Sequence, residues 1–223
     1  MKRNSKKYFG YTGALFGIFT IFTVLVACFD VKPIGPEKSS VGFAAINQFV
    51  VQKMGVHLIW YDVTDWLGVI AILFALGFAA IGFYQLITRK SVRKVDRQIL
   101  VLGMFYVLVI AFYLLFEQAA INYRPVMLNG GLEASYPSSH TMIVVCIMAT
   151  AAMQFRMLFP KKTKLCLGVN AVAVVLSAVT VIGRFVSGVH WFTDIVGGLL
   201  LSAALIALYC AVIELTEEKK TTE

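Results

Sequence analysis

Long apolar runs separated by short polar segments dominate the pattern of side chains along the chain. Most of these runs carry no charged residue over 19 to 22 positions, about the number that crosses the hydrocarbon core of a bilayer. One run is shorter, but it can be extended past Arg156. The pattern predicts spanning helices at about residues 8–29, 66–87, 98–116, 138–159, 165–183 and 192–213. We therefore expect an all-α integral membrane protein, a six-helix bundle that forms a single membrane-embedded domain over residues 1–223.

The segment 41–60, between the first two predicted spanning helices, is apolar but interrupted by amides and loosened by glycines. The interrupting residues are Gly42, Asn47, Gln48, Gln52 and Gly55. Such a segment is typical of an interfacial or re-entrant helix, and we predict one here. Trp60, Tyr61 and Trp66 then form an aromatic belt where the chain enters the bilayer. Thr64 is expected to cap the second spanning helix.

The composition excludes a soluble enzyme, since 59% of the residues are hydrophobic and only 14% are charged, against about 25% charged in soluble domains. The net charge of +8 comes from short basic clusters and not from a basic stripe, so no nucleic-acid partner is expected. With the N-terminus inside, 15 of the 20 Lys and Arg residues fall in the segments 1–7, 88–97, 156–164 and 214–223. The positive-inside rule then predicts a multi-pass cell-membrane protein with both termini, including the charged tail 214–223, in the cytoplasm.

The four cysteines lie in or at the ends of apolar runs, at positions Cys28, Cys146, Cys166 and Cys210. Their spacing fits neither a metal site nor a disulfide framework, so we interpret them as small buried hydrophobic residues. One alternative remains for Cys28, because the sequence Leu-Val-Ala-Cys that ends there resembles a bacterial lipoprotein cleavage box. Cleavage at that box would remove the first helix and leave a lipid on Cys28.

Polar residues that suggest chemistry lie at the outer ends of helices three to six. Arg124-Pro125 follows the third helix and, taken alone, is typical of an anchor at the membrane edge. The sequence Tyr-Pro-Ser-Ser-His at 136–140 precedes the fourth helix, where free backbone N–H groups bind anions readily. A single histidine such as His140 at a helix start is more often a structural cap, so this segment is informative only together with the others.

The segment 183–194 opens the sixth helix and contains Arg184, His190 and Asp194. A spacing of four places His190 and Asp194 on one face of a helix, where the carboxylate fixes the tautomer and makes the other ring nitrogen a better nucleophile. The guanidinium of Arg184 suits phosphate oxygens. Since the topology brings all these segments to one outer face, they predict phosphoryl transfer without a metal. An alternative with His140 and His190 as metal or haem ligands leaves the arginines and serines without a role.

The ordered set of motifs resembles the type-2 phosphatidic acid phosphatase superfamily. The signature of that family is K-x6-R-P, then P-S-G-H, then S-R-x5-H-x3-D. This chain has Glu117-x6-Arg124-Pro, then Pro-Ser-Ser-His140, then Gly-Arg184-x5-His190-x3-Asp194, with the same spacing in each block. The resemblance covers the six-helix body, from residue 8 to about residue 213.

The resemblance implies a role for each matching residue. His190 would attack phosphorus and form a phosphohistidine, and Asp194 would orient His190. His140 would protonate the leaving group and then activate water. The residues that would hold the phosphoryl oxygens are Arg124, Arg184, Ser138 and Ser139. No metal and no cofactor are implied.

Three positions depart from the family signature, namely Glu117, Ser139 and Gly183. Glu117 matters most, because it replaces a lysine and so reverses a charge where the family binds phosphate. It either pairs with Arg124 two helical turns later, or lies at the outer edge without touching substrate, or marks a weakened or altered phosphatase. Our hypothesis is that Glu117 makes the site less positive and disfavours multiply charged head groups.

The expected function is an integral-membrane phosphatase that hydrolyses a lipid phosphate or diphosphate, of the polyprenyl diphosphate or phosphatidylglycerophosphate class, at the outer membrane face. Its expected partners are the lipid substrate and the phospholipid bilayer, with no obligate protein partner. One alternative is a phosphotransferase in which a hydroxyl acceptor replaces water in the same histidine chemistry. The other is a catalytically weakened relative that binds lipid phosphates.

Overall fold

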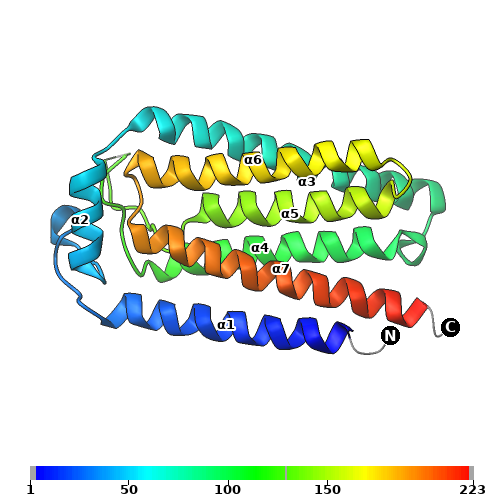
Figure 1. Ribbon diagram of the computed structural model, residues 1–223, viewed down its shortest axis with the longest axis horizontal. Helices are drawn as coiled ribbons and strands as arrows, with labels where there is room; N and C mark the ends of the chain where they lie inside the picture. The colour runs from blue at the N-terminus through cyan, green and yellow to red at the C-terminus, as the bar shows by residue number, and fades with distance from the viewer. Residues whose placement is uncertain (1–3, 129, 221–223) are drawn as a thin grey trace.

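The bundle consists of seven α-helices and two short 3-10 helices over residues 4–128 and 130–220, the part of the chain that the computed structural model describes (Figure 1). The α-helices are α1 (Asn4–Cys28), α2 (Ala44–Met54), α3 (Leu58–Arg89), α4 (Arg97–Ala119), α5 (Ser139–Leu158), α6 (Thr163–Ser187) and α7 (Phe192–Lys220). The 3-10 helices are η1 (Pro36–Lys38) and η2 (Val92–Lys94). All the helices except α2, η1 and η2 are long and apolar enough to cross a membrane, which confirms the expected six-helix membrane fold.

Helices α5 and α7 form the interior of the bundle. Half or more of the residues in their most apolar stretches are buried, against fewer than a third in the other four spanning helices. Small residues at the contacts, such as Ala151 in α5 and Ala204 and Ala211 in α7, are fully buried and let the helices approach closely. Large apolar side chains, including Trp66 and Phe83, point outward, as expected for a surface in contact with lipid.

The two ends of the bundle differ in what they carry. The start of α1, the end of α7 and the α3–α4 and α5–α6 connections lie at one end (Figure 1). The short helix α2, the α4–α5 loop and the α6–α7 connection lie at the other end. The described residues of the basic clusters therefore lie at the first end, and the predicted site residues gather at the second.

The expected helix boundaries need correction around α3. The second spanning helix begins at Leu58 and not at residue 66, so the expected interfacial segment 41–60 is reduced to the eleven-residue helix α2. Thr64 does not cap this helix. It lies inside α3, where its hydroxyl donates to the carbonyl oxygens of Trp60 and Tyr61 at 2.7 and 2.9 Å. Such bonds to the preceding turn are a common way for a threonine to satisfy its hydroxyl inside a helix.

Two other spanning helices are longer than expected at their ends. Helix α6 continues to Ser187 and not to residue 183, so Arg184 lies in its last turn. Helix α7 continues past residue 213 to Lys220, while the remainder of the expected tail, 221–223, lies outside the described residues.

The cysteines are free thiols, and only Cys146 and Cys166 are buried as expected. Cys210 is half-buried, and Cys28, the last residue of α1, is exposed.

Candidate active site

The starts of α5 and α7 meet at the end of the bundle that carries α2. Two glycines in α7 permit this approach: a Cβ added at Gly198 would lie 2.9 Å from the carbonyl oxygen of Ser138, and one at Gly197 would lie 2.5 Å from the ring of Tyr136. The backbone N–H of Ser138 donates to the carbonyl oxygen of Asp194 at 2.9 Å. The N-termini of both helices are therefore held next to each other, and both present backbone N–H groups to the same region.

Ser138 and Ser139 occupy the start of α5. Ser138 is its N-cap, fully buried, and its hydroxyl accepts a long hydrogen bond of 3.5 Å from the N–H of Thr141. Ser139 is half-buried and is the first residue of the helix. A capping serine stabilises the helix start, so the hydroxyl of Ser138 has a structural task besides the predicted binding of phosphoryl oxygens.

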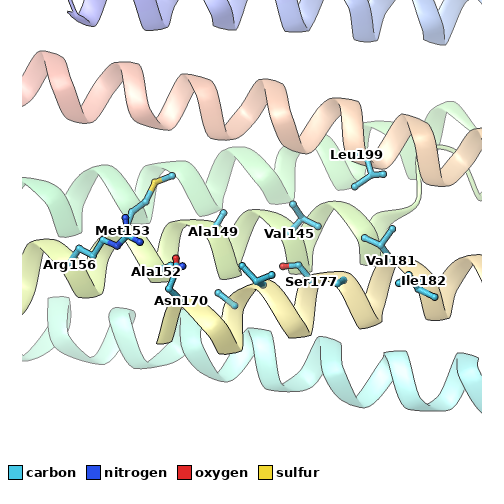
Figure 2. Close-up of a pocket in the computed structure, with 13 residues that line it drawn as sticks. Val145, Ala149, Ala152, Met153, Arg156, Asn170, Ser177, Val181, Ile182 and Leu199 are labelled. Atoms are coloured by element: carbon cyan, nitrogen blue, oxygen red, sulfur yellow. The ribbon is translucent and has the colours of Figure 1, made fainter. Parts of the chain in front are cut away.

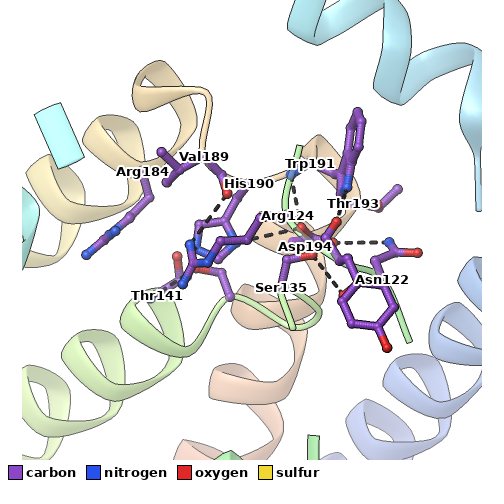
Figure 3. Close-up of polar contacts among 12 residues, drawn as sticks. Asn122, Arg124, Ser135, Thr141, Arg184, Val189, His190, Trp191, Thr193 and Asp194 are labelled. Carbon is purple, nitrogen blue, oxygen red and sulfur yellow. Dashed lines mark hydrogen bonds and ion pairs between the residues drawn. The ribbon is translucent and has the colours of Figure 1, made fainter. Parts of the chain in front are cut away.

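His190 and Asp194 lie within reach of each other, although not on one helix. His190 lies in the connection before α7, and Asp194 lies in the first turn of α7. The histidine Nδ1 is 3.6 Å from the Asp194 Oδ2, and both side chains are buried. The carboxylate also accepts from the N–H of Trp191 at 2.9 Å and from the side-chain amide of Asn122 at 3.2 Å. Figure 3 shows these groups converging on Asp194.

The other ring nitrogen of His190 faces Arg124. The Arg124 Nη1 is 3.1 Å from the His190 Nε2. A guanidinium only donates hydrogen bonds, so Nε2 must be the acceptor and carry a lone pair. The ring proton is then on Nδ1, on the side of the Asp194 carboxylate, and the nitrogen with the lone pair is Nε2, which faces Arg124.

Electrostatics favour the neutral form of His190. Burial lowers the pKa of His190 well below its ordinary value, and the positive charges of Arg124 and Arg184 lower it further. At neutral pH the imidazole is therefore uncharged, which is the form that can act as a nucleophile.

The carboxylate partner of Arg124 is Glu133, and not Glu117 as one of the expectations had it. The Arg124 Nε lies 3.0 Å from the Glu133 Oε2, and the Arg124 backbone N–H donates to the Glu133 carbonyl oxygen at 2.9 Å. Helix α4 ends at Ala119, and Ala120 has a left-handed conformation, so the chain turns before Arg124. Glu117 and Arg124 therefore do not share a helix face. Glu117 is exposed near the end of α4 and lines a small recess together with Ser139.

Arg184 is fully buried and contacts a carboxylate that the sequence analysis missed. Its Nη2 forms an ion pair with the Oδ1 of Asp65 in α3, and its guanidinium lies over the ring of Tyr61, 4.7 Å from the ring centre. The same Asp65 Oδ1 is 3.0 Å from the His140 Nε2. Asp65 thus connects Arg184 in α6 with His140 in α5.

Close packing of α3 against α6 explains why residue 183 is a glycine. A Cβ added at Gly183 would lie 2.5 Å from the methyl group of Thr64 and 3.2 Å from the ring of Trp60. The volume that the serine of the family signature would need is therefore occupied by α3. The methyl group of Thr64, which lies inside α3, fills most of this volume.

Asn47 in α2 holds the start of α7 in place. Its side-chain oxygen accepts from the N–H of Thr193 at 3.2 Å, and its amide donates to the hydroxyl of Thr193 at 2.9 Å. Asn47 is fully buried. The amide that interrupts the apolar segment 41–60 in the sequence thus satisfies a free N–H group at the N-terminus of the helix that carries Asp194.

Residues that contact the predicted site and went unrecognised in the sequence include Asp65 and Asn122. Asn122 lies two residues before Arg124, and an amide this close to the Arg-Pro motif was the available signal. Asp65 is an acidic residue within an aromatic and apolar stretch, which is a default candidate for function in a spanning helix. Among the described residues, no group of three or more His, Cys, Asp or Glu side chains is arranged to hold a metal ion.

A groove of about 600 Å³ runs along the bundle between α5 and α6 (Figure 2). Its lining is almost entirely apolar, from Ile182 near the polar site to Arg156 and Asn170 at the far end. The lining residues of the groove include the hydroxyl of Ser177 but no histidine, carboxylate or thiol that could act as a general base. The residues that can carry out chemistry therefore lie at the end of the bundle, where Arg184 follows Ile182 by two positions.

Comparison with known proteins agrees with this arrangement. The chain matches a solved transmembrane PAP2-type phosphatidylglycerolphosphate phosphatase from Bacillus subtilis with a TM-score of 0.62 and 20% identity, over 92% of this chain and 96% of the other. This similarity extends over the whole bundle and shows a common fold. No curated protein matches the chain in sequence. The family model of the PAP2 superfamily matches residues 69–216, which include every predicted site residue, and the chain belongs to that superfamily.

Proposed function

We propose that this protein is an integral-membrane phosphatase that hydrolyses a lipid phosphate or diphosphate through a phosphohistidine intermediate. The observation that carries the proposal is the geometry of His190: it is buried, and its Nε2 lone pair faces Arg124 while its Nδ1 faces Asp194. A neutral imidazole beside a carboxylate and two guanidinium groups suits attack on a phosphoryl group.

In the first half-reaction, the Nε2 lone pair of His190 attacks phosphorus, and the bond between phosphorus and the leaving oxygen breaks. The electron pair of that bond stays on the leaving oxygen, which takes a proton from His140. The phosphorylated imidazole is positively charged on its ring, and the Asp194 carboxylate stabilises that charge through Nδ1. Trp191 and Asn122 hold this carboxylate next to the ring, with its Oδ2 3.6 Å from Nδ1.

In the second half-reaction, water attacks the phosphohistidine, and the bond between phosphorus and Nε2 breaks. His140, now neutral, accepts the proton that the water loses. Inorganic phosphate leaves, and His190 regains its lone pair. One histidine thus acts as nucleophile, while the other alternates between acid and base.

Arg124, Arg184 and the N-terminus of α5 would stabilise the negative charge on the phosphoryl oxygens. Arg184 is buried, so its interaction with an anion is weakly screened by water. The Arg124 Nη1 contacts His190 and must move aside or bind a phosphoryl oxygen when phosphorus approaches Nε2. Its Nε already faces the Glu133 carboxylate, which limits how far it can turn.

A lipid is the substrate class that suits the surroundings of the site. The apolar groove begins near Ile182, two residues from Arg184, and is long enough to take a hydrocarbon tail. The basic clusters lie at the opposite end of the bundle, so the positive-inside rule favours a site at the outer membrane face with both termini in the cytoplasm. The expected lipids are polyprenyl diphosphate or phosphatidylglycerophosphate, and Glu117 at the rim of the site favours the less highly charged head group.

The test is phosphate release in detergent, with a chelator present, from undecaprenyl diphosphate, phosphatidylglycerophosphate and phosphatidic acid. We expect the parent to release phosphate from at least one lipid and His190→Ala to lose turnover by about 10⁴-fold or more. The matched control is His57→Ala, because His57 is exposed and its Nε2 contacts only the carbonyl oxygen of Met54 at 2.9 Å. Equal turnover by the parent and His190→Ala would refute the proposal.

Two further outcomes identify the alternatives. Transfer of the phosphoryl group to an added alcohol in preference to water would identify a phosphotransferase. Binding of the lipids without turnover would identify a weakened relative, and Glu117→Lys would then be expected to restore hydrolysis.

A further inference from the structure

We propose that Asp65 is a positioning residue of this site, a carboxylate that orients both the acid–base histidine His140 and the phosphate-binding Arg184. The inference deepens the proposed function and rests on it for the roles of these two residues. Its geometric basis is the single oxygen atom, Oδ1 of Asp65, that contacts the His140 Nε2 at 3.0 Å and also forms the ion pair with Arg184.

The contacts of Asp65 leave a specific set of atoms for substrate. Among the described residues, the Nε and Nη1 of Arg184 and the Nδ1 of His140 are buried and have no hydrogen-bond partner. Buried donors without a partner are rare in proteins and are often explained by a ligand. Asp65 therefore occupies one nitrogen of each residue and leaves the other nitrogens for the phosphoryl and leaving oxygens.

The arrangement determines which nitrogen of His140 moves protons. Because the carboxylate accepts the hydrogen on Nε2, the neutral ring keeps its proton there and has its lone pair on Nδ1. In the charged ring, Nδ1 carries the second proton. Donation to the leaving oxygen and later acceptance from water then both occur at Nδ1, and the ring does not need to turn between the two half-reactions.

Two glycines allow α3 to bring Asp65 to this position. Gly68 lies one turn after Asp65 on the same face of α3, and a Cβ there would be 3.4 Å from the Cδ2 of His140, so the ring packs directly on the helix. Gly183 lets α3 approach α6 next to Arg184, as described above. The departure from the family signature at Gly183 and the contact of Asp65 with Arg184 are thus parts of one packing arrangement.

Charge balance provides a second, independent argument. Arg184 is fully buried, and an arginine at such a position requires a partner of opposite charge. The other two carboxylates near the site have other partners, since Glu133 pairs with Arg124 and Asp194 accepts from the Trp191 N–H and the Asn122 amide. Asp65 is the carboxylate that remains for Arg184. Its own side chain is 40% exposed, so it can also adjust when an anion enters.

The experiment compares two substrates with different leaving groups in the parent, in Asp65→Asn and in the control Asp62→Asn. Asp62 lies one turn earlier on α3, is exposed, and has a carboxylate of the same size. One substrate is a lipid phosphate, whose alkoxide leaving group needs a proton. The other is p-nitrophenyl phosphate, whose leaving group departs without one. The quantity measured is the rate of the first turnover for each substrate.

We expect Asp65→Asn to slow the first turnover of the lipid phosphate by about 10- to 100-fold, a part of the usual effect of acid–base catalysis. The rate with p-nitrophenyl phosphate should fall by a few-fold at most, and Asp62→Asn should match the parent. A loss of folding would lower both rates equally. Equal losses for both substrates, or no loss, would overturn the inference. If Asp65→Asn is not stable in detergent, Asp65→Glu replaces it and should retain more lipid turnover than Asp65→Ala.

A second readout does not depend on turnover. The chain has three histidines, so their ring nitrogen resonances can be assigned by single substitution in ¹⁵N-histidine-labelled protein. The Nε2-bound proton of His140 should move upfield in Asp65→Asn and stay in place in Asp62→Asn. An unchanged His140 resonance would refute the inference even if the parent proved inactive, whereas an inactive parent with a shifted resonance would refute only the proposed function.

Discussion

The site contains two histidine–carboxylate pairs whose surroundings differ. His190 and Asp194 are four residues apart, both side chains are buried, and the carboxylate is fixed by a backbone N–H and an asparagine amide. His140 and Asp65 come from different helices, their side chains are 31% and 40% exposed, and the carboxylate is shared with Arg184. The same two functional groups are therefore held once in a rigid, dry environment and once at a partly open edge.

This difference matches two different chemical tasks. A nucleophile benefits from a fixed position and from the absence of water, which would compete for the phosphoryl group. An acid–base residue must contact the leaving group first and water afterwards, so it needs access. Two pairs of titratable groups with different surroundings are a common way to divide such roles within one site.

Breaking the buried pair should have the largest effect. We expect Asp194→Asn to slow turnover by about 10³- to 10⁴-fold, because the neutral amide no longer favours the proton on Nδ1 and the ring can take the wrong tautomer. The loss should be similar for the lipid phosphate and for p-nitrophenyl phosphate, since both need the same nucleophile. Steady-state rates in detergent measure it, and a loss confined to the lipid substrate would contradict the assignment.

Breaking the open pair should have a smaller and more selective effect. We expect His140→Ala to slow lipid hydrolysis by about 10²- to 10⁴-fold. With p-nitrophenyl phosphate it should give a rapid burst of about one product molecule per protein and then a slow phase, because the leaving group departs unaided while water attack is unassisted. Stopped-flow absorbance measures the burst, and its absence would show that His140 is needed for the first step with every substrate.

The smallest expected effect concerns stability and pH. The pKa of His190 is lowered in the folded protein, so below about pH 6.5 the unfolded chain binds a proton that the folded chain does not. The contribution of neutral His190 to the free energy of unfolding is therefore fully present above that pH. It decreases as the pH falls, by up to about 1.4 kcal/mol per pH unit. His190→Gln should therefore lose less stability on acidification than the parent or His57→Gln, as measured by denaturation in mixed micelles. Equal slopes for all three proteins would contradict the lowered pKa.

Much of the fold could be predicted from the sequence, because a bilayer imposes a simple rule on helix length and polarity. All six spanning helices follow from apolar runs. The start of the second spanning helix was less predictable, because aromatic and acidic residues are mixed before residue 66. Trp60, Asp62 and Asp65 suggest a membrane interface, but they lie inside α3. Packing against α6 extends the helix there, and local composition does not contain that information.

The site was predictable where its contacts are local or where the motifs resemble a known family. Asp65 contacts Arg184 across 119 positions of sequence, and Asn122 contacts Asp194 across 72, so no spacing rule could find either. The expected pairing of Glu117 with Arg124 failed for a local reason, because Ala120 ends the helix between them. Even the contact of His190 with Asp194 arises from a turn before α7 and not from the helix face that the spacing suggested.

The most direct test of the central claim is to identify the residue that carries the phosphoryl group. The parent, His140→Ala and His190→Ala would be mixed with ³²P-labelled p-nitrophenyl phosphate, quenched in alkaline denaturant to preserve phosphohistidine, and digested for mass spectrometry. We expect label on His190, with more label in His140→Ala than in the parent and none in His190→Ala. Label on any other residue, or turnover without any labelled protein in His140→Ala, would contradict the central claim.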